Sequence, residues 1–381
     1  MYFSDKFLNL SGERFSVLYR IFGSEKEVFS IANDITVEQT VEFPYECLPL
    51  GDIKESIVGK IEEVQRYDEE SYKVKISYAV EIVGEEFTQF LNVLFGNISM
   101  RENIQLIDIE LSGTILSNFS GPRFGVEGIR DIIGVFDRPI IFSALKPIGL
   151  SSEELASIAY DLALGGVDVI KDDHGIADQS FSRFSERVKL CTEAVNKANK
   201  VTGNKSIYVP NITGSYRNVI KRAKEAKEAG AGGVLICPIL TGFDVIREIS
   251  NDDSINLPIF SHPAFIGSFA VNKFGISHSA IFGLIQRLSG ADCSIFPNYG
   301  GRFSFSTEEC KSILNGCTRE FYNIKPIFPS PAGGMTLGKV EEIIKFYGKD
   351  TMLLIGGGLF QGEKGLLENC RDLKKAIEEF K

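Results

Sequence analysis

Short apolar segments rich in β-branched residues alternate with helical stretches from about residue 119 onward. The stretches between them, such as 152–166 and 217–230, carry apolar residues at helical spacing and end near a glycine. This alternation is typical of parallel strands joined by helices. The apolar segments are PIIFSALK (139–146), VDVIKDD (167–173), SIYVPNIT (206–213), GVLICPIL (233–240), PIFSHPA (258–264), CSIFPN (293–298), KPIFPSPAG (325–333) and TMLLIGGG (351–358).

Eight such units within about 260 residues match the usual size of a (β/α)8 TIM barrel. An open doubly wound sheet is the alternative α/β fold, but no strong G-x-G-x-x-G motif follows the first strand. We therefore predict a barrel over residues 119–381.

The pattern before the barrel is different and predicts a separate α+β domain with an antiparallel sheet over residues 1–118. The stretch SNFSGPRFG marks the linker to the barrel. Partial alternation of apolar and polar residues predicts strands at 14–22, 72–83 and 103–113, and helices are predicted at 52–64 and 85–97.

The composition and net charge of the chain limit the classes of binding partner that we expect. The chain has 381 residues, 44% hydrophobic and 24% charged, as in an ordinary globular protein. Its net charge of -10 argues against nucleic acid or an anionic membrane as the main partner, but backbone N–H groups could still bind a phosphorylated substrate. The seven cysteines show no C-x-x-C spacing, and no signal peptide or membrane-spanning apolar run is visible, so we expect a cytoplasmic protein with reduced thiols.

Titratable residues gather where the predicted strands end, which in a βα barrel is the end that carries the active site. Lys171, Asp173 and His174 follow the second strand, and Lys146 and His262 end the first and fifth. Period-two alternation places Lys171 and Asp173 on one face and Asp172 on the other. A carboxylate with further donors around one point suits a divalent cation.

Each of these residues also has a simpler interpretation. The KDDH cluster could be a solvated charged turn, Lys146 a surface lysine, and His262 a hydrogen-bonded core histidine. The glycines that follow strands seven and eight, at 333–334 and 356–358, could form tight turns, although paired glycines at these places in a barrel also predict a phosphate-binding cradle.

Several segments together resemble the large subunit of RuBisCO, and more closely the RuBisCO-like proteins (form IV), in order and spacing over nearly the whole chain. The resemblance implies a ferredoxin-like N-terminal domain before the barrel and a homodimer with shared active sites. The segments are VEQTVEFP, VLFGNIS, FSALKPIGLS, GGVDVIKDDHGIADQSFSRFSERV, FSHPAF, PSPAGGM and LLIGGGLFQG.

The resemblance also implies a role for each matching residue. Lys171 would carry a CO2-derived carbamate that binds Mg2+ or Mn2+, with Asp173 as a second ligand and His174 in place of the family's glutamate. Lys146 would be the acid/base lysine, and His262 matches the strand-five histidine of the active site. The phosphate binders would be the backbones of Gly333, Gly334, Gly357 and Gly358, and the residues that reach the partner subunit's site would be Glu38 and Asn97.

Departures from the family pattern argue against CO2 fixation. The stretch FPNYGGRFSFS after strand six has no lysine, Pro263 replaces the second phosphate-binding arginine, and the loop KPIGLS is one residue shorter. We therefore expect metal-dependent enolisation, isomerisation or decarboxylation of a phosphorylated sugar-derived ketone or β-keto acid, of the methylthio-pentulose phosphate or 3-oxo-isoapionate 4-phosphate type. The alternatives are a Schiff-base aldolase on the same barrel and a non-catalytic relative that binds a sugar phosphate.

Overall fold

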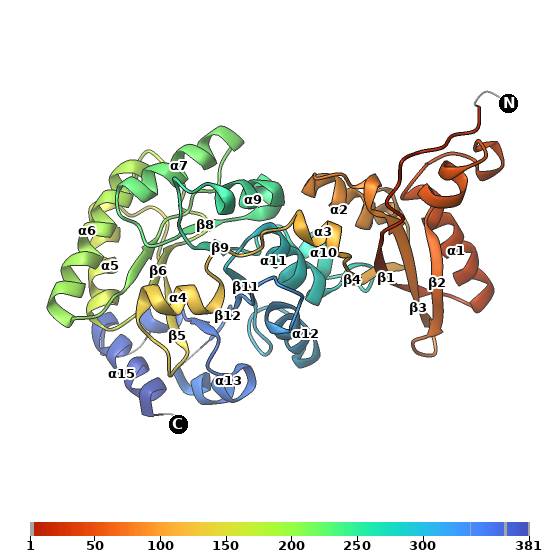
Figure 1. Cartoon of the computed structure of the whole chain (residues 1–381). Coiled ribbons are helices and arrows are strands. Elements are labelled where there is room, and N and C mark those ends of the chain that lie inside the picture. The colour runs from red at the N-terminus through yellow and green to blue at the C-terminus, as the bar shows by residue number, and fades with distance from the viewer. Residues whose placement is uncertain (1–3, 336, 362–363, 380–381) are drawn as a thin grey trace. The chain divides into compact units, whose positions relative to one another are not determined.

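The computed structural model describes residues 4–335, 337–361 and 364–379, which form two compact units (Figure 1). The first unit comprises the chain up to Ser120 together with Gly267–Ile281, and the second comprises Gly121–Ile266 and the chain from Phe282 onward. The units differ from the predicted domains, 1–118 and 119–381, mainly in Gly267–Ile281, which the sequence placed within the barrel domain. The division into an N-terminal domain at 1–118 and a catalytic domain at 119–381 stays a prediction.

The first unit has the ferredoxin-like order of strands and helices, as expected. Its sheet runs β10-β4-β1-β3-β2, with β1 antiparallel to β3 and β4 and with the short β10 parallel to β4. The elements are β1 (Arg14–Phe22), α1 (Glu25–Glu38), β2 (Lys60–Arg66), β3 (Ser71–Ala79), α2 (Phe87–Phe95), β4 (Ile104–Glu110), α3 (Gly113–Ser117), α10 (Gly267–Ala270) and β10 (Gly275–Ile276), with short 3₁₀ or π turns at Tyr45–Cys47, Ile53–Ile57, Val80–Ile82 and Asn97–Met100.

The helix predicted at 52–64 is wrong. Only a single π-helical turn forms there, at Ile53–Ile57, and β2 follows it at the edge of the sheet. Gly59 separates the two, where an added Cβ would lie 3.1 Å from the backbone of Thr36. The largely exposed, charged strand KIEEVQR imitates a helical pattern because an edge strand buries few of its side chains.

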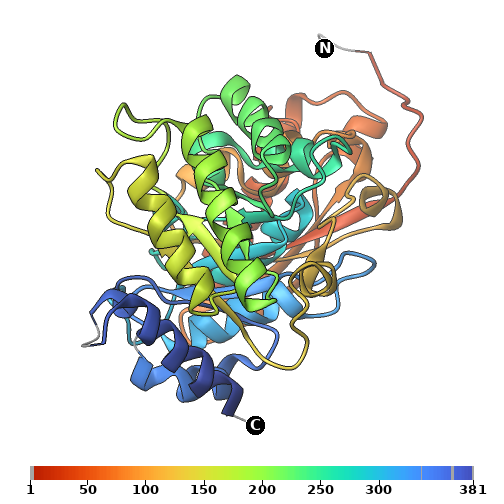
Figure 2. The same ribbon diagram turned by 90° about the vertical axis from the view of Figure 1, so that its left-hand side faces the viewer.

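The described residues of the second unit form eight strands, each within one of the predicted segments, with helices on their outer side. Figure 2 shows α5 and α6 side by side on this outer side. The elements are α4 (Gly125–Ile133), β5 (Ile140–Leu145), α5 (Ser152–Leu164), β6 (Val169–Asp172), α6 (Phe184–Thr202), β7 (Ile207–Val209), α7 (Tyr216–Glu228), β8 (Val234–Ile236), α8 (Pro238–Thr241), α9 (Phe243–Asn251), β9 (Ile259–Ser261), α11 (Ile285–Ser289), β11 (Cys293–Pro297), α12 (Thr307–Thr318), β12 (Phe328–Ala332), α13 (Val340–Tyr347), β13 (Met352–Leu354), α14 (Gly357–Phe360) and α15 (Leu366–Glu379), with short turns at Ala280–Leu284 and Leu337–Lys339.

The eight strands form two parallel four-stranded sheets, β13-β5-β6-β7 and β8-β9-β11-β12. Backbone hydrogen bonds join β7 to β8, including a bridge between Asn211 and Leu235. At the other seam, between β12 and β13, side chains make the link: Thr351 Oγ1 donates to Pro329 O (2.9 Å) and Ser330 Oγ to Met352 O (3.1 Å). The proline explains this seam, because it has no N–H to donate to β13.

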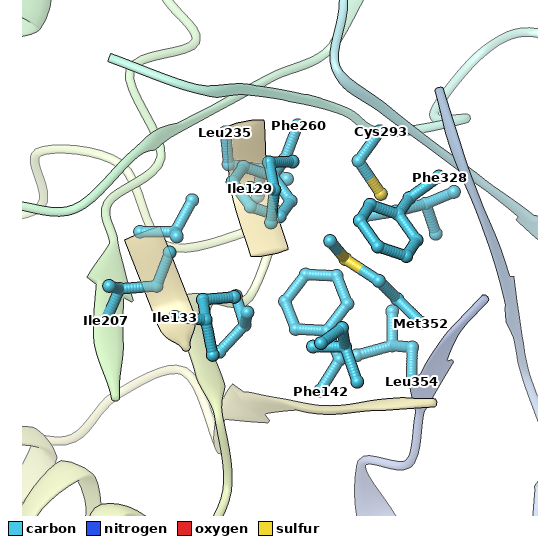
Figure 3. Close-up of a cluster of buried hydrophobic side chains, with 14 of the residues drawn as sticks. Ile129, Ile133, Phe142, Ile207, Leu235, Phe260, Cys293, Phe328, Met352 and Leu354 are labelled. Atoms are coloured by element: carbon cyan, nitrogen blue, oxygen red, sulfur yellow. The ribbon is translucent and has the colours of Figure 1, made fainter. Parts of the chain in front are cut away.

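One hydrophobic cluster draws on all eight strands and confirms that they surround a common interior. Every strand contributes at least one inward side chain, and α4 adds Val126, Ile129 and Ile133 (Figure 3). Inward positions alternate along each strand, as in Ile140 and Phe142 on β5. The predicted (β/α)8 barrel is therefore confirmed.

Candidate active site

The inward rows of the barrel core continue into the charged residues at the strand ends. Every second residue along a strand faces the same side, so the inward face that contains Phe142 also contains Lys146. In the same way, the inward face that contains Val169 also contains Lys171 and Asp173. The inward face of Phe260 likewise contains His262. The packing of the core therefore directs these side chains toward the mouth of the barrel.

Asp172 points the opposite way and is fully buried behind the site. Its Oδ2 accepts hydrogen bonds from Arg187 Nε (3.1 Å) and from the Asn211 backbone N–H (3.0 Å), and its Oδ1 accepts one from the Tyr208 hydroxyl (2.6 Å). Both charged partners are 0% exposed. Asp172 thus holds α6 against the barrel, in agreement with its predicted place on the outer face.

Lys171 is buried among the other titratable groups, with 2% of its surface exposed. Its ammonium donates to the backbone oxygen of Asp172 at 3.0 Å. Burial lowers the pKa of Lys171 to about 8; the charge of Lys146 adds to this effect, and Asp173 opposes it. A substantial share of the amine is therefore neutral slightly above neutral pH, which is the form that reacts with carbonyl carbon or CO2.

Asp173 contacts two of the other predicted residues. Its Oδ1 lies 2.9 Å from Lys146 Nζ and 3.6 Å from His174 Nδ1. Burial opposes ionisation of this carboxyl, but hydrogen bonds from His174 and Lys146 and the charge of Lys171 outweigh it and hold the pKa of Asp173 well below its usual range. Asp173 is therefore an anion at any physiological pH.

The two histidines lie face to face. The rings of His174 and His262 are 4.2 Å apart between centroids, with 13° between their planes. Burial, assisted by Lys171 and His174, lowers the pKa of His262 well below its usual value. The backbone N–H of Ala264 donates to His262 Nδ1 at 3.2 Å, so the neutral ring carries its proton on Nε2.

Two further residues near this cluster, Cys237 and Asn211, were not among the predicted site residues. The Cys237 sulfur lies 3.9 Å from His262 Nδ1, and burial raises the pKa of its thiol. Asn211 Nδ2 donates to the backbone oxygens of His174 and Ile176, both at 2.9 Å, and so fixes the loop that carries His174. Both residues follow a barrel strand, β8 or β7, and this position is the sequence signal that could have indicated a place in the site.

The glycines lie at the expected strand ends. Gly333 and Gly334 follow β12 with φ of +83° and +87°, a region that favours glycine. Gly357 and Gly358 begin α14 after β13, and an added Cβ on the preceding Gly356 would lie 3.7 Å from Lys146 Cε. The strand-eight glycines are therefore close to the lysine cluster, and their phosphate-binding role stays a prediction.

Glu38 and Asn97 lie together in the first unit. Glu38 ends α1, Asn97 follows α2, and Asn97 Nδ2 donates to Glu38 Oε1 at 3.1 Å. The structure thus brings these two residues, 59 positions apart, into one polar pair.

The donor set tests the predicted metal site. In the described part of the chain, no three His, Cys, Asp or Glu side chains gather in a way that could hold a metal ion. Asp173 offers one carboxylate and His174 one imidazole, while Lys171 is a cation. These residues fit a hard divalent cation only after a carbamate has converted Lys171 into an oxygen donor.

The comparisons with known proteins agree with this fold. A model of the catalytic domain of the ribulose bisphosphate carboxylase large chain matches residues 125–298. A ribulose bisphosphate carboxylase-like protein of Rhodopseudomonas palustris is 36% identical over 358 residues, which are 94% of this chain and 96% of the relative. The chain belongs to the RuBisCO-like proteins.

Two other relatives carry named activities. The 5-methylthioribulose-1-phosphate isomerase of Rhodospirillum rubrum is 35% identical, covering 93% of this RuBisCO-like chain and 94% of the relative. The 2,3-diketo-5-methylthiopentyl-1-phosphate enolase of Bacillus licheniformis is 32% identical, covering 93% of the chain and 88% of the relative.

Solved structures give the same family. A RuBisCO-like protein from Rhodopseudomonas palustris superimposes with a TM-score of 0.86 at 37% identity, covering 96% of this chain and 98% of that chain. The dimeric archaeal RuBisCO of Hyperthermus butylicus has a TM-score of 0.86 at 25% identity, covering 99% and 92%. Among the described helices of this RuBisCO-like protein, none combines the length and apolar character that crossing a membrane requires.

Proposed function

We propose that this RuBisCO-like protein enolises a phosphorylated, sugar-derived ketone or β-keto acid, which leads to isomerisation or decarboxylation, and that it does not fix CO2. The observation that carries the proposal is the placement of two lysines near one carboxylate: the Lys146 ammonium lies 2.9 Å from Asp173, and the charge of Asp173 also acts on the buried amine of Lys171. Two relatives named for methylthio-pentulose phosphate reactions support this substrate class over a 3-oxo-isoapionate 4-phosphate.

Lys146 is the residue proposed to move the proton. Its side chain is partly exposed and held by Asp173, so it can reach a carbon next to a carbonyl without losing its position. His262, neutral and protonated on Nε2, would donate a hydrogen bond to the developing enolate oxygen. Gly333, Gly334, Gly357 and Gly358 would bind the phosphate through their backbone N–H groups.

The cofactor proposal concerns the same cluster. Members of the RuBisCO family use Mg2+ and a carbamylated lysine. Here Lys171, as a carbamate, would hold Mg2+ or Mn2+ together with Asp173 and His174. The bound cation would polarise the substrate carbonyl.

A direct test measures proton exchange and CO2 fixation separately. With 5-methylthioribulose 1-phosphate in D2O, we expect deuterium to enter at the carbon next to the carbonyl, detected by NMR. With ribulose 1,5-bisphosphate and labelled CO2 we expect no labelled phosphoglycerate, because Pro263 stands in place of the second phosphate-binding arginine and loop 298–306 has no lysine to stabilise the carboxylation transition state. Labelled phosphoglycerate would show that the second half of the proposal is wrong.

A Schiff-base mechanism is the second candidate. The lowered pKa of Lys171 supports it, because a neutral buried amine can attack a ketone. Borohydride reduction in the presence of the ketone would attach the substrate covalently to Lys171 in this case. A metal-dependent enolase would show no such attachment.

Exposed apolar side chains support a dimer with shared sites. In the described part of the second unit, most large hydrophobic side chains that are exposed lie in the connections that lead from a strand to the next long helix, or at the start of that helix, which is the mouth side of the barrel. They are Ile148, Phe181, Tyr216, Leu240, Phe265, Phe303 and Phe360. An apolar rim of this kind marks a surface that a partner covers.

The first unit has a matching feature. Near the pair of Glu38 and Asn97 in sequence, Phe43, Tyr45 and Met100 are exposed as well. We propose that this surface of one subunit covers the barrel mouth of its partner, which brings Glu38 and Asn97 into the partner's active site. The dimeric RuBisCO of Hyperthermus butylicus supports this arrangement.

Mixing two inactive variants tests the shared site. Asn97→Ala and Lys171→Ala chains each lack one half of every site, but a heterodimer regains one complete site. After subunit exchange we expect about a quarter of the wild-type activity, because half of the dimers are mixed and each has one intact site of two. Heterodimers that form, as shown by two-tag purification, but remain inactive would count against a shared site.

A further inference from the structure

The loop between β11 and α12 rests directly on the glycine pair that follows β12. A Cβ added to Gly301 would lie 2.0 Å from the backbone oxygen of Gly333, so the two backbones are in direct contact and no side chain fits between them. The backbone nitrogen of Arg302 lies 3.1 Å from the place of a Cβ on Gly334. This contact fixes the position of the Arg302 backbone, and therefore the point from which its side chain starts.

The side chain of Arg302 turns back over the same glycines. Its Nε lies 3.9 Å from the place of a Cβ on Gly333, and its guanidinium carbon lies 5.0 Å from the centre of the Phe303 ring. Within the residues that the structure describes, Arg302 takes part in no hydrogen bond or ion pair. The exposed guanidinium of Arg302 therefore has N–H donors available for a ligand. It lies beside Gly333 and Gly334, whose backbone a ligand can approach closely because glycine has no side chain.

A second cation strengthens the positive charge here. Lys339, at the start of α13, donates from Nζ to the backbone oxygen of Gly300 at 3.1 Å, one residue before Gly301. This lysine ties the loop down and adds a charge to the same corner of the barrel mouth. In a protein with a net charge of -10, such a local cluster favours a small anion.

We propose that Arg302 binds the phosphate group of the substrate beside Gly333 and Gly334, with its planar guanidinium donating two hydrogen bonds to phosphate oxygens. The proposal rests on the proposed function in one respect, since the phosphate is that of the enolised substrate. It adds a specificity-determining side chain to a site otherwise made of glycine backbone. Arg302 was not among the site residues predicted from the sequence, because its position in this loop matches no motif of the family.

Binding of two probes by calorimetry tests the proposal without relying on turnover. With inorganic phosphate and with ribulose 5-phosphate, we expect Arg302→Ala to weaken binding by roughly 10- to 100-fold and Arg302→Lys to restore part of it. Arg371→Ala, which removes an exposed arginine from α15, is the matched control and should leave both affinities unchanged. Because Arg302 is exposed, folding should not be affected in any of the variants.

Two results would overturn the inference. One is an affinity of Arg302→Ala within about twofold of the wild type for both probes. The other is an undetectable affinity of the wild-type protein for either probe. If the wild type binds both probes in an Arg302-dependent way but exchanges no deuterium into its substrate, the inference holds and the proposed function fails.

Discussion

Replacing Lys171 by alanine is expected to lower turnover of the true substrate by about a thousandfold or more, because the side chain would act both in holding the cation and in setting the charge of the site. Asp173→Asn should have a similar effect, since it removes the anion that Lys146 and His174 contact. The measurement is the rate of deuterium exchange under saturating substrate.

Preincubation adds a second readout for the same residue. Bicarbonate with Mg2+ or Mn2+ should raise the activity of the wild type before substrate is added, because carbamate formation must precede cation binding. Lys171→Ala should show no activation, whereas Lys189→Ala, an exposed lysine on α6, should behave as the wild type. If chelators and both site substitutions leave turnover unchanged, the KDDH segment is only a charged turn.

The largest expected loss of stability follows from removing the neighbouring carboxylate, Asp172. Asp172→Ala should lower the free energy of unfolding by about 3–5 kcal/mol, because it leaves Arg187 charged, buried and without its partner. The Tyr208 hydroxyl and the Asn211 N–H would lose their acceptor as well. Denaturant unfolding followed by circular dichroism measures the change.

Asp173→Ala is the matched control for this prediction. Asp173 is 19% exposed and faces the mouth, so its loss should change stability far less while abolishing activity. Asp172 would then be needed mainly for stability, and its neighbour Asp173 mainly for activity. A loss below about 1 kcal/mol for Asp172→Ala would contradict the buried ion pair.

The sequence predicted the barrel well because each of its strands is a compact apolar segment between amphipathic helices. It failed where the pattern is ambiguous: β2 is an edge strand with few buried side chains, and α1 was not predicted at all. The signal for α1 was nevertheless present, because its buried residues Val28, Ala32, Ile35 and Thr36 have helical spacing and follow a capping box.

The candidate site was predictable in its residues but not in its contacts. Alternation along β6 was sufficient to separate Lys171 and Asp173 from Asp172. It could not indicate that His174 would stack on His262, because that contact joins two strands far apart in the chain. The partner of Asp172 was equally hidden, since nothing in the sequence of α6 marks Arg187 as buried.

The two seams of the barrel, one a narrow backbone bridge and the other bonded through side chains, divide it into two half-barrels of four strands. Lys146, Lys171 and Asp173 belong to one half, and His262 and Gly333 belong to the other. If these residues bind the substrate as proposed, the substrate would connect the two halves across the seams, and its binding energy would resist their separation. Ligand binding and the stability of the closed barrel would then be thermodynamically linked.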